Sequence, residues 1–404
     1  MKKTYFSVLV LMVCSLSFIN KGTAQMPVYM HTPQIQALVN DVEIDTMWTN
    51  LNYLQTHQRF TSNSGSLVTA NYLKTYMKTM GFDSVYFQNY TMPGSSFVSP
   101  NIIGIKFGEV IPDSIFLACG HWDAYTSMAP GADDNGSGTV SVLEAARVLL
   151  QQNYKKTLKF CLFSGEEQGL YGSSKYVQVS SGDKIGAALN LDMISYQEPG
   201  NNLRIGVFPQ SGKTSLYNKV NILQQLYVPG IEIGNENGCP YACTDVYPFW
   251  EAGIDGLFFF ESSDFGYNET PYYHTSNDVV NTSANSQPKL DLTTKIIVAS
   301  LATWAEIFTN TDIVKNNAKA TLSNYPNPFS NTTKIAFQLN TNTNLTLNVT
   351  DIAGKVVATL IDNKYVSAGI HEIPFEANSL KGGMYLYNLI SANGNITRKM
   401  MLID

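Results

Sequence analysis

The chain has 404 residues, of which 44% are hydrophobic and 14% are charged. This composition excludes a disordered or collagen-like chain, and the length predicts two to three domains with a well-buried core. The formal net charge of −6 is unevenly placed, because residues 25–314 hold 27 acidic and 15 basic side chains, a net charge of −12. A nucleic-acid-binding protein needs a basic face, so we expect no nucleic-acid partner.

The first 24 residues have the pattern of an export signal. Lys2 and Lys3 precede a largely apolar run over residues 5–19, and small residues close the segment at Ala24. This order is typical of a secretory signal peptide, so we expect cleavage after Ala24. No other stretch reaches the ~20 apolar residues that a membrane helix requires. The sequence therefore predicts an exported mature chain with no membrane span.

The residues up to about 310 alternate between helical and strand-like patterns. Apolar residues recur at a spacing of three to four in residues 26–61 and 66–80, which predicts helices there. Apolar runs predict strands over residues 102–107, 115–119, 158–163, 185–191 and 257–260, and helical spacing predicts helices over 139–150, 215–226 and 292–308. Strands that are apolar throughout and alternate with helices indicate an α/β fold, in which a mixed, mostly parallel sheet is flanked by helices.

Asn and Thr become frequent beyond Asn310, and short strands replace the alternating pattern. We expect these strands over residues 332–339, 345–350, 355–361, 369–375 and 384–391, with Gly and Asn at the turns. Such spacing predicts a small all-β sandwich. We divide the chain into a signal peptide (1–24), an α/β domain (25–312), a linker (313–322) and the sandwich (323–404).

Acidic and histidine side chains follow three of the predicted strands. His121 and Asp123 follow one strand, Glu166 and Glu167 follow a second, and Asp192 follows a third. Taken singly, each would more often be a structural residue or a helix cap. Because the carboxyl ends of parallel strands meet at one edge of a sheet, we expect these side chains to lie close together.

Two predicted loops add further groups to this edge. Asp133 and Asp134 precede a Gly-rich helix start, and His274 follows the strand over residues 257–260. So many like charges cannot share a site without a cation, and imidazole and carboxylate groups without a thiolate suit zinc, or less well manganese or cobalt. The sequence therefore predicts a metal centre.

Four cysteines remain after the signal peptide. Cys239 and Cys243 lie four residues apart and can close a small disulfide ring in an exported protein, where the ring would fix the shape of a loop. Half of a zinc ribbon is the alternative, but a second closely spaced pair is missing. Cys119 and Cys161 lie in apolar runs, so we expect buried thiols.

Five segments in a fixed order carry a resemblance to a known family. They are Gly-His-Trp-Asp at 120–123, Pro-Gly-Ala-Asp-Asp-Asn-Gly-Ser-Gly at 130–138, Ser-Gly-Glu-Glu-Gln-Gly-Leu-Tyr-Gly-Ser at 164–173, Leu-Asp-Met at 191–193 and His-Thr-Ser-Asn-Asp at 274–278. Over roughly residues 38–310 the chain resembles the secreted bacterial di-zinc aminopeptidases of the leucyl aminopeptidase type, in peptidase family M28. The resemblance implies a zinc-peptidase-like fold, two Zn²⁺ ions per chain and peptide substrates with a free N-terminus.

The resemblance also implies a ligand set. Asp133 would bridge the two zinc ions, and Asp134 would follow it through an unusual peptide geometry. The remaining ligands would be His121 and Asp192 at one ion, and Glu167 and His274 at the other.

Three further residues receive roles from the resemblance. Asp123 would hold the imidazole of His121 from behind the metal. Glu166 is left without a metal and would be the general base. Tyr241, presented by the ring of Cys239 and Cys243, would donate a hydrogen bond to the developing oxyanion.

The expected substrate follows from charge and from nearby aromatic residues. A free α-amine is a cation, and a carboxylate-rich site can hold it, which favours removal of N-terminal residues. Phe260, Phe265, Tyr272 and Tyr273 could line a hydrophobic pocket for the first residue, although aromatic runs are more often core than pocket.

The last 80 residues carry a second resemblance. Tyr-Pro-Asn-Pro-Phe at 325–329, Asp-Ile-Ala-Gly-Lys at 351–355, Gly-Gly-Met-Tyr at 382–385 and the pair Arg398-Lys399 resemble the sorting domain read by the type IX secretion system. This implies the secretion machinery as a partner, and a secreted or cell-surface location reached through the periplasm. The alternative is a retained sandwich that binds substrate or cell wall.

Other functions remain open on the same fold. Glutaminyl cyclases share it but work with one zinc ion, and the complete set of five ligands favours hydrolysis instead. A carboxypeptidase would need a basic cluster for the substrate carboxylate. A non-catalytic surface peptide-binding protein would be expected to lack a ligand or the base, and the sequence retains them all.

Overall fold

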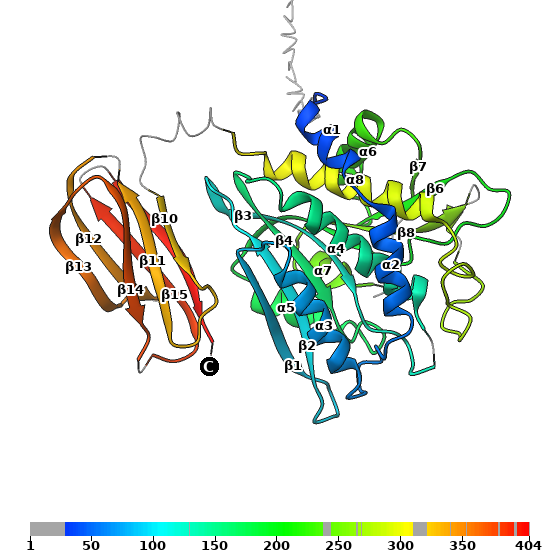
Figure 1. Cartoon of the computed structure of the whole chain (residues 1–404), viewed down its shortest axis with the longest axis horizontal. Coiled ribbons are helices and arrows are strands. Elements are labelled where there is room, and N and C mark those ends of the chain that lie inside the picture. Colours follow the sequence, from blue (N-terminus) through cyan, green and yellow to red (C-terminus); the bar gives the residue numbers. More distant parts are fainter. Residues whose placement is uncertain are drawn as a thin grey trace, which may run out of the picture.

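The structure is a computed structural model. It describes residues 29–128, 130–236, 244–263, 266–267, 269–309, 321–339, 341–352, 354–378, 380–391 and 394–403. Within these residues the chain forms an α/β domain and an antiparallel β domain, drawn side by side in Figure 1. The expected signal peptide at residues 1–24 lies outside the described residues and stays a prediction.

The α/β domain contains the elements expected from the sequence and several others. Its helices are α1 (Pro33–Asn40), α2 (Ile44–Leu54), α3 (Ser66–Lys78), α4 (Gly138–Leu149), α5 (Tyr171–Val179), α6 (Ser215–Tyr227), α7 (Tyr247–Glu251) and α8 (Gln287–Ala305). Its strands are β1 (Ser84–Thr91), β2 (Val98–Lys106), β3 (Ile111–His121), β4 (Lys156–Phe163), β5 (Lys184–Leu191), β6 (Arg204–Pro209), β7 (Glu232–Asn235), β8 (Gly256–Ser263) and β9 (Gly266–Tyr267). The sequence pattern misses β1, because this strand lies at the sheet edge and is only partly buried.

The main sheet has the strand order β1-β2-β4-β3-β5-β8-β6-β7. The central strands β4, β3, β5 and β8 are parallel neighbours. β2 pairs antiparallel with β4 at one side, and β6 pairs antiparallel with β8 at the other. The prediction of a mixed sheet flanked by helices is confirmed, although only the central strands and the β6-β7 pair are parallel. Its consequence is that β3, β4 and β5 end side by side, with His121 in register with Phe163.

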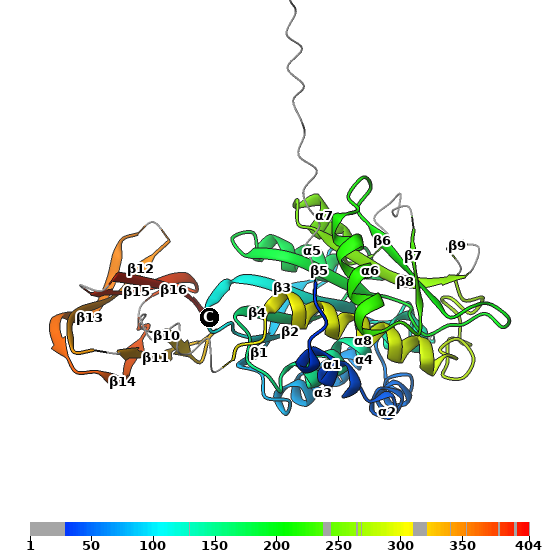
Figure 2. The ribbon, with the colours of Figure 1, turned by 90° about the horizontal axis from the view of Figure 1, so that it is seen from above.

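Helices cover both faces of this sheet. The largest apolar cluster joins one face to α1–α4, α6 and α8, whereas α5 and α7 pack on the opposite face, as Figure 2 shows. Successive strand residues serve the two faces in turn: Ala118 and Phe160 belong to the first cluster, and Cys119 and Cys161 belong to the second. Both cysteines are buried free thiols, as the sequence predicts.

The antiparallel domain is a two-sheet sandwich. Its strands are β10 (Thr321–Tyr325), β11 (Thr332–Leu339), β12 (Thr343–Asp351), β13 (Val356–Val366), β14 (Gly369–Glu376), β15 (Gly383–Ser391) and β16 (Gly394–Leu402). One sheet has the order β10-β11-β14 and the other β13-β12-β15-β16. Alternate residues of β11, among them Ile335 and Phe337, point into a core that is separate from that of the α/β domain. The sequence pattern predicts the five strands β11 to β15 and misses the first and last strands, β10 and β16.

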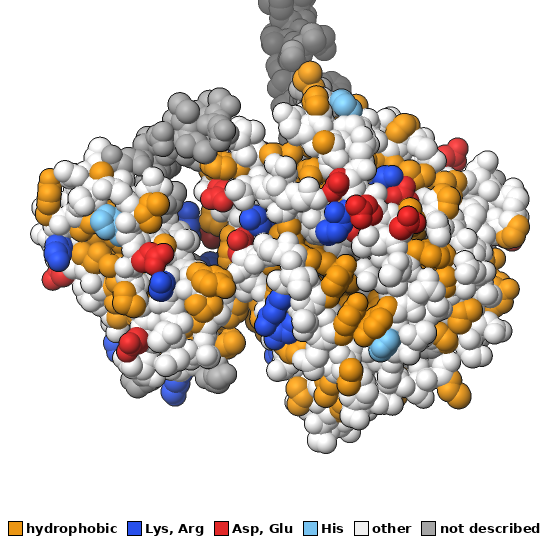
Figure 3. Space-filling view, in the orientation of Figure 1, with side chains coloured by type: hydrophobic (Ala, Val, Ile, Leu, Met, Phe, Trp, Pro, Cys, Tyr) orange, Lys and Arg blue, Asp and Glu red, His pale blue; other side chains and the backbone are white. Residues whose placement is uncertain are grey.

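Charged side chains of both signs gather over the helices on the face drawn in Figure 3. Ion pairs connect charged residues of these helices: Arg147 of α4 lies 2.7 Å from the buried Glu144 and 3.4 Å from Asp41, which follows α1. Among the described residues, no helix has both the length and the hydropathy needed to cross a membrane.

Candidate metal centre

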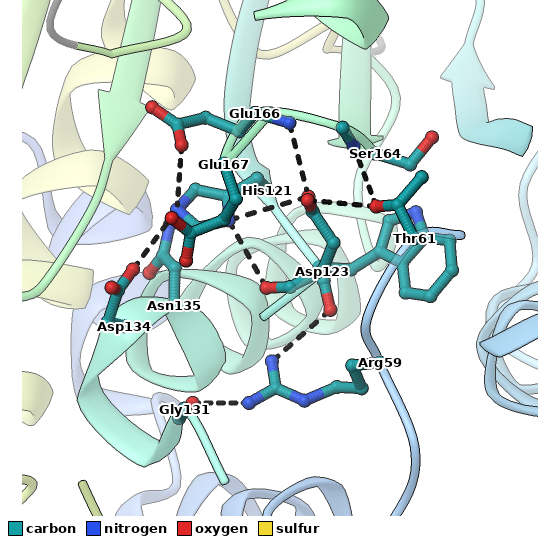
Figure 4. A network of polar contacts seen from close by, with 12 residues as sticks. Arg59, Thr61, His121, Asp123, Gly131, Asp134, Asn135, Ser164, Glu166 and Glu167 are labelled. Atoms are coloured by element: carbon teal, nitrogen blue, oxygen red, sulfur yellow. Dashed lines mark hydrogen bonds and ion pairs between the residues drawn. The ribbon is translucent and has the colours of Figure 1, made fainter. Parts of the chain in front are cut away.

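The carboxyl ends of three adjacent parallel strands deliver the candidate residues. His121 is the last residue of β3, Asp192 follows β5 directly, and Glu166 and Glu167 lie in the turn after β4. Gly165, with φ of +68°, makes the sharp bend that brings the two glutamates over the sheet edge. Figure 4 shows His121, Glu166 and Glu167 around one another. The structure therefore brings together residues that the sequence separates by up to 71 positions.

Asp134 lies between the two histidines. Its Oδ1 is 3.4 Å from Nε2 of His121, and its Oδ2 is 3.2 Å from Nε2 of His274. Each histidine also meets another carboxylate: Asp192 Oδ1 is 3.2 Å from His121 Nε2, and Glu167 Oε2 is 3.0 Å from His274 Nε2. One carboxylate thus faces two separate groups of donors, which is the arrangement that a shared ligand of two metal ions requires.

Asp133 does not occupy this position, and the expectation that it bridges the metals has to be corrected. Its Oδ1 accepts a hydrogen bond of 2.9 Å from the backbone amide of Ser195, and its carboxyl group lies beside the buried Glu261. The physical reason is local: the side chains of the neighbouring residues Asp133 and Asp134 point to opposite sides of this turn. The non-proline cis peptide bond follows Asp134 and joins it to Asn135.

Asp278 holds the loop that presents Asp134. Its two carboxylate oxygens accept hydrogen bonds of 2.8 and 3.0 Å from the backbone amides of Asp133 and Asp134, and its backbone carbonyl accepts a third, of 3.0 Å, from Ala132. Asp278 lies four residues after His274, so the same turn carries a candidate ligand and fixes the position of another.

Asp123 stands behind His121, on the side of the ring away from Asp134. Its Oδ1 is 3.5 Å from Nδ1 of His121 and accepts a hydrogen bond of 3.4 Å from the backbone amide of Glu166. Its Oδ2 accepts a hydrogen bond of 2.9 Å from the Thr61 hydroxyl (Figure 4). Asp123 is fully buried, so these contacts fix its orientation and with it the imidazole.

Thr244 orients Asp192 in a similar way. Its hydroxyl donates a hydrogen bond of 3.0 Å to Oδ2 of Asp192 and accepts one of 2.6 Å from the side-chain amide of Asn190. The sequence gives no signal for Thr244, because a single threonine after a loop has no distinguishing spacing.

A fully buried arginine lies beneath the carboxylates. The guanidinium of Arg59 donates to the carbonyl oxygens of Trp122, Pro130 and Gly131, and so ties the segment before α3 to the loop that carries Asp134 (Figure 4). Burial lowers the pKa of Arg59, while the field of nearby acids, Asp278 first, opposes that shift. Arg59 therefore acts as the fixed positive charge below a strongly negative site.

Burial and the two histidines act in opposite directions on the pKa of the acidic groups: burial would raise the pKa of Asp134, but its contacts with His121 and His274 lower it. Burial prevails at the two glutamates. It raises the pKa of Glu166 well above its ordinary value and raises the pKa of Glu167 to about 8. Burial lowers the pKa of the His121 imidazole, but the carboxylates of Asp192 and Glu166 outweigh it, so the net pKa lies well above the ordinary value. The protein part of the site therefore lacks the positive charge that its carboxylates need.

The donor set fits divalent metal ions. Oδ2 of Asp134 and Oε1 of Glu167 are buried and accept no hydrogen bond. Two groups of three residues each bring their nitrogen and oxygen donors within 4.8 Å of one another. The first group is His121, Asp134 and Glu167, and the second is His121, Glu166 and Asp192. Imidazole and carboxylate donors without a thiolate are typical of catalytic zinc sites.

Other residues singled out in the sequence have different positions. Phe260 is 5% exposed and packs against Phe208 and Phe258, which places it in the hydrophobic core and not in an open pocket. Tyr272 is half-buried in the turn before His274. Tyr241, Phe265 and the cysteines at 239 and 243 lie outside the described residues, so their roles and the disulfide stay predictions.

Comparisons with solved structures show which known proteins share the fold. The zinc aminopeptidase BSAP from Bacillus subtilis superposes with a TM-score of 0.58 at 17% sequence identity, over 66% of this chain and 96% of that one. Glutaminyl cyclase from Porphyromonas gingivalis superposes with a TM-score of 0.53 at 21% identity, over 65% of this chain and 99% of that one. The α/β domain therefore has the fold seen in zinc aminopeptidases, and the glutaminyl cyclase shares it.

Sequence comparison identifies the two parts of the chain. Residues 101–300 match the model of peptidase family M28, and residues 323–403 match that of the secretion system C-terminal sorting domain. The probable leucine aminopeptidase of Arthroderma benhamiae is 34% identical over 198 residues, which is 47% of this chain and 48% of that protein. The aligned segment thus spans about half the length of this curated relative. The chain therefore has a segment similar to M28 peptidases, followed by a segment similar to C-terminal sorting domains.

Proposed function

We propose that the α/β domain is an exported di-zinc aminopeptidase that removes N-terminal hydrophobic residues from peptides. The observation that supports this best is Asp134, whose two oxygens face the two histidines. In this proposal Asp134 would be a shared ligand of two zinc ions. His121 and Asp192 would complete one site, and Glu167 and His274 the other.

The protein groups divide the remaining work. Two zinc ions held here would lower the pKa of water and polarise the scissile carbonyl group. Glu166 lies farther from His121 Nε2 than Asp192 does, at 4.0 against 3.2 Å, and is free to act as the general base. It accepts the proton of the attacking water and returns it to the leaving amine. Asp123 keeps the His121 ring oriented throughout.

The preference for a free N-terminus rests on charge. The carboxylates around Glu166 and Glu167 are buried and short of positive charge, so the α-ammonium group of a peptide is a fitting partner for them. Tyr272, with Phe265, is the proposed wall for a hydrophobic first side chain. Phe260 has no part in that wall, because it lies in the core.

Hydrolysis of leucine 4-nitroanilide tests the proposal. We expect the purified mature protein to cleave it, a zinc chelator to abolish the activity, and added zinc to restore it. The N-acetylated anilide serves as the control, since acetylation blocks the free amine and removes its positive charge. Equal cleavage of both anilides would contradict an aminopeptidase.

A peptide that begins with glutamine distinguishes the two enzyme alternatives. A glutaminyl cyclase would release ammonia from it and leave every peptide bond intact, whereas an aminopeptidase releases free glutamine. Binding of glutamine-initiated and leucine-initiated peptides without any product from either would indicate a non-catalytic surface protein. We expect free amino acids as the products.

We propose that the sandwich directs the chain through a type IX secretion system to the outside or the cell surface. The match of residues 323–403 to the sorting domain supports this. Deleting residues 321–404 is expected to leave the protein inside cells of a host that has this system. The full-length protein, followed by immunoblot of cells and medium, is the control. Equal export of both forms would favour a retained binding module instead.

A further inference from the structure

The imidazole of His274 is enclosed between two tyrosine rings. The ring centroid of Tyr125 lies 3.6 Å from that of His274, at an interplanar angle of 6°. The ring of Tyr273 lies at the same distance, 3.6 Å, at an angle of 23°. The three rings form a continuous stack, with the histidine in its centre.

The two histidines of the site are therefore held in different ways. A carboxylate, Asp123, stands behind Nδ1 of His121. Within the part of the chain that the structure describes, no carbonyl or carboxylate group accepts a hydrogen bond from Nδ1 of His274; its Nε2 faces Asp134 and Glu167. A metal-binding histidine normally has such an acceptor, which fixes the tautomer and the plane of the ring.

The backbone of His274 does not supply this restraint either. His274 has a φ of +59°, in the left-handed region that non-glycine residues seldom adopt, and it lies in a surface turn and not in a helix or strand. The plane of its ring is therefore set by the two neighbouring rings. They come from separate segments, Tyr125 from the loop after β3 and Tyr273 from the turn itself.

The tyrosines have no other evident structural task. Tyr125 is 41% exposed and Tyr273 is 38% exposed, so neither builds the core. Neither hydroxyl group forms a hydrogen bond with another described residue. Both tyrosines stack one face of the ring on the imidazole of His274.

We propose that Tyr125 and Tyr273 are positioning residues, which hold the His274 imidazole for a metal ion by stacking in place of a hydrogen-bond acceptor. This rests on the proposed function only in taking His274 as a metal ligand. Aromatic pairs in stacked geometry attract one another beyond simple burial, and loss of a partner behind a metal ligand typically lowers metal affinity by about 10–100-fold.

Titration of the metal-free protein with cobalt(II), followed by absorption, tests the proposal without any substrate. We expect two binding events in the wild type. In Tyr125→Leu the affinity of one event falls by about 10–100-fold, and the other event is unchanged. Tyr125→Phe restores the wild-type affinity, because it keeps the ring and removes only the hydroxyl. Tyr365→Leu, an exposed tyrosine of the sandwich, is the matched control.

Three results would overturn the proposal: unchanged affinity in Tyr125→Leu, an equal loss in Tyr125→Phe, or an equal weakening of both binding events. Tyr273→Leu and Tyr273→Phe repeat the comparison from the other side of the ring. Circular dichroism of each variant shows whether it folds. Two cobalt sites in a protein that cleaves no peptide would contradict the proposed function and leave the stacking role intact, so the two failures are distinguishable.

Discussion

Replacing Glu166 by Gln is expected to lower kcat by about 10²–10⁴-fold, the usual contribution of a general base. The substitution keeps the size of the side chain and removes its ability to take a proton. Zinc content is expected to stay near that of the wild type, because His121 keeps its contacts with Asp134 and Asp192. Steady-state kinetics on leucine 4-nitroanilide and zinc analysis by mass spectrometry measure the two quantities on the same sample.

The control for this variant is Glu232→Gln, which removes one exposed carboxylate from β7. It is expected to change neither kcat nor zinc content. If Glu166→Gln retained full turnover, the base would have to be another group. If it lost zinc together with activity, Glu166 would be a ligand.

Exchanging the neighbouring aspartates separates the two candidates for the bridging ligand. Asp134→Asn is expected to lower zinc affinity by more than about 100-fold, above the range for a lost partner of a ligand, because a ligand itself is lost. Asp133→Asn is expected to bind zinc as the wild type does, since its amide oxygen can still accept the hydrogen bond from the Ser195 amide. Competition with a chromophoric chelator measures both affinities.

Each aspartate variant is the matched control of the other, as both replace one carboxyl group by an amide in the same turn. Asp133→Asn is expected to cost no more than about 1–2 kcal/mol of unfolding free energy, since one buried contact with Glu261 changes. Denaturant unfolding of the metal-free proteins checks that figure. The reverse order of zinc affinities would restore Asp133 as the bridge.

Sequence pattern predicts the parts of the site that secondary structure controls. His121, Glu166, Glu167 and Asp192 follow apolar strands, and the order of parallel strands forces such positions to one edge. It could not choose between Asp133 and Asp134. Two identical residues in one turn differ only in the direction of their side chains, which the backbone sets after folding.

Contacts between distant segments could not be predicted from the sequence, for a different reason. Arg59 and Thr61 precede α3, yet they reach the site only because that segment passes beneath the loop of Asp134. Thr244 meets Asp192 across 52 positions. No local spacing marks such partners. The positions of the aromatic residues could not be predicted either. Phe260 and Tyr272 lie in similar sequence surroundings, and only the packing of the folded chain places Phe260 in the core.

The three hydrogen bonds that Asp278 accepts from the amides of residues 132–134 have a consequence for assembly of the centre. Two of these bonds are accepted by the Asp278 carboxylate, whose pKa is raised to about 6 by burial and by the charge of Asp134, so the full set of acceptors is present above about pH 6. The loop of Asp134 and the turn of His274 are thereby set against each other before any ion arrives. A metal ion therefore binds to a preorganised site. The two loops lose their conformational entropy during folding and not during metal binding.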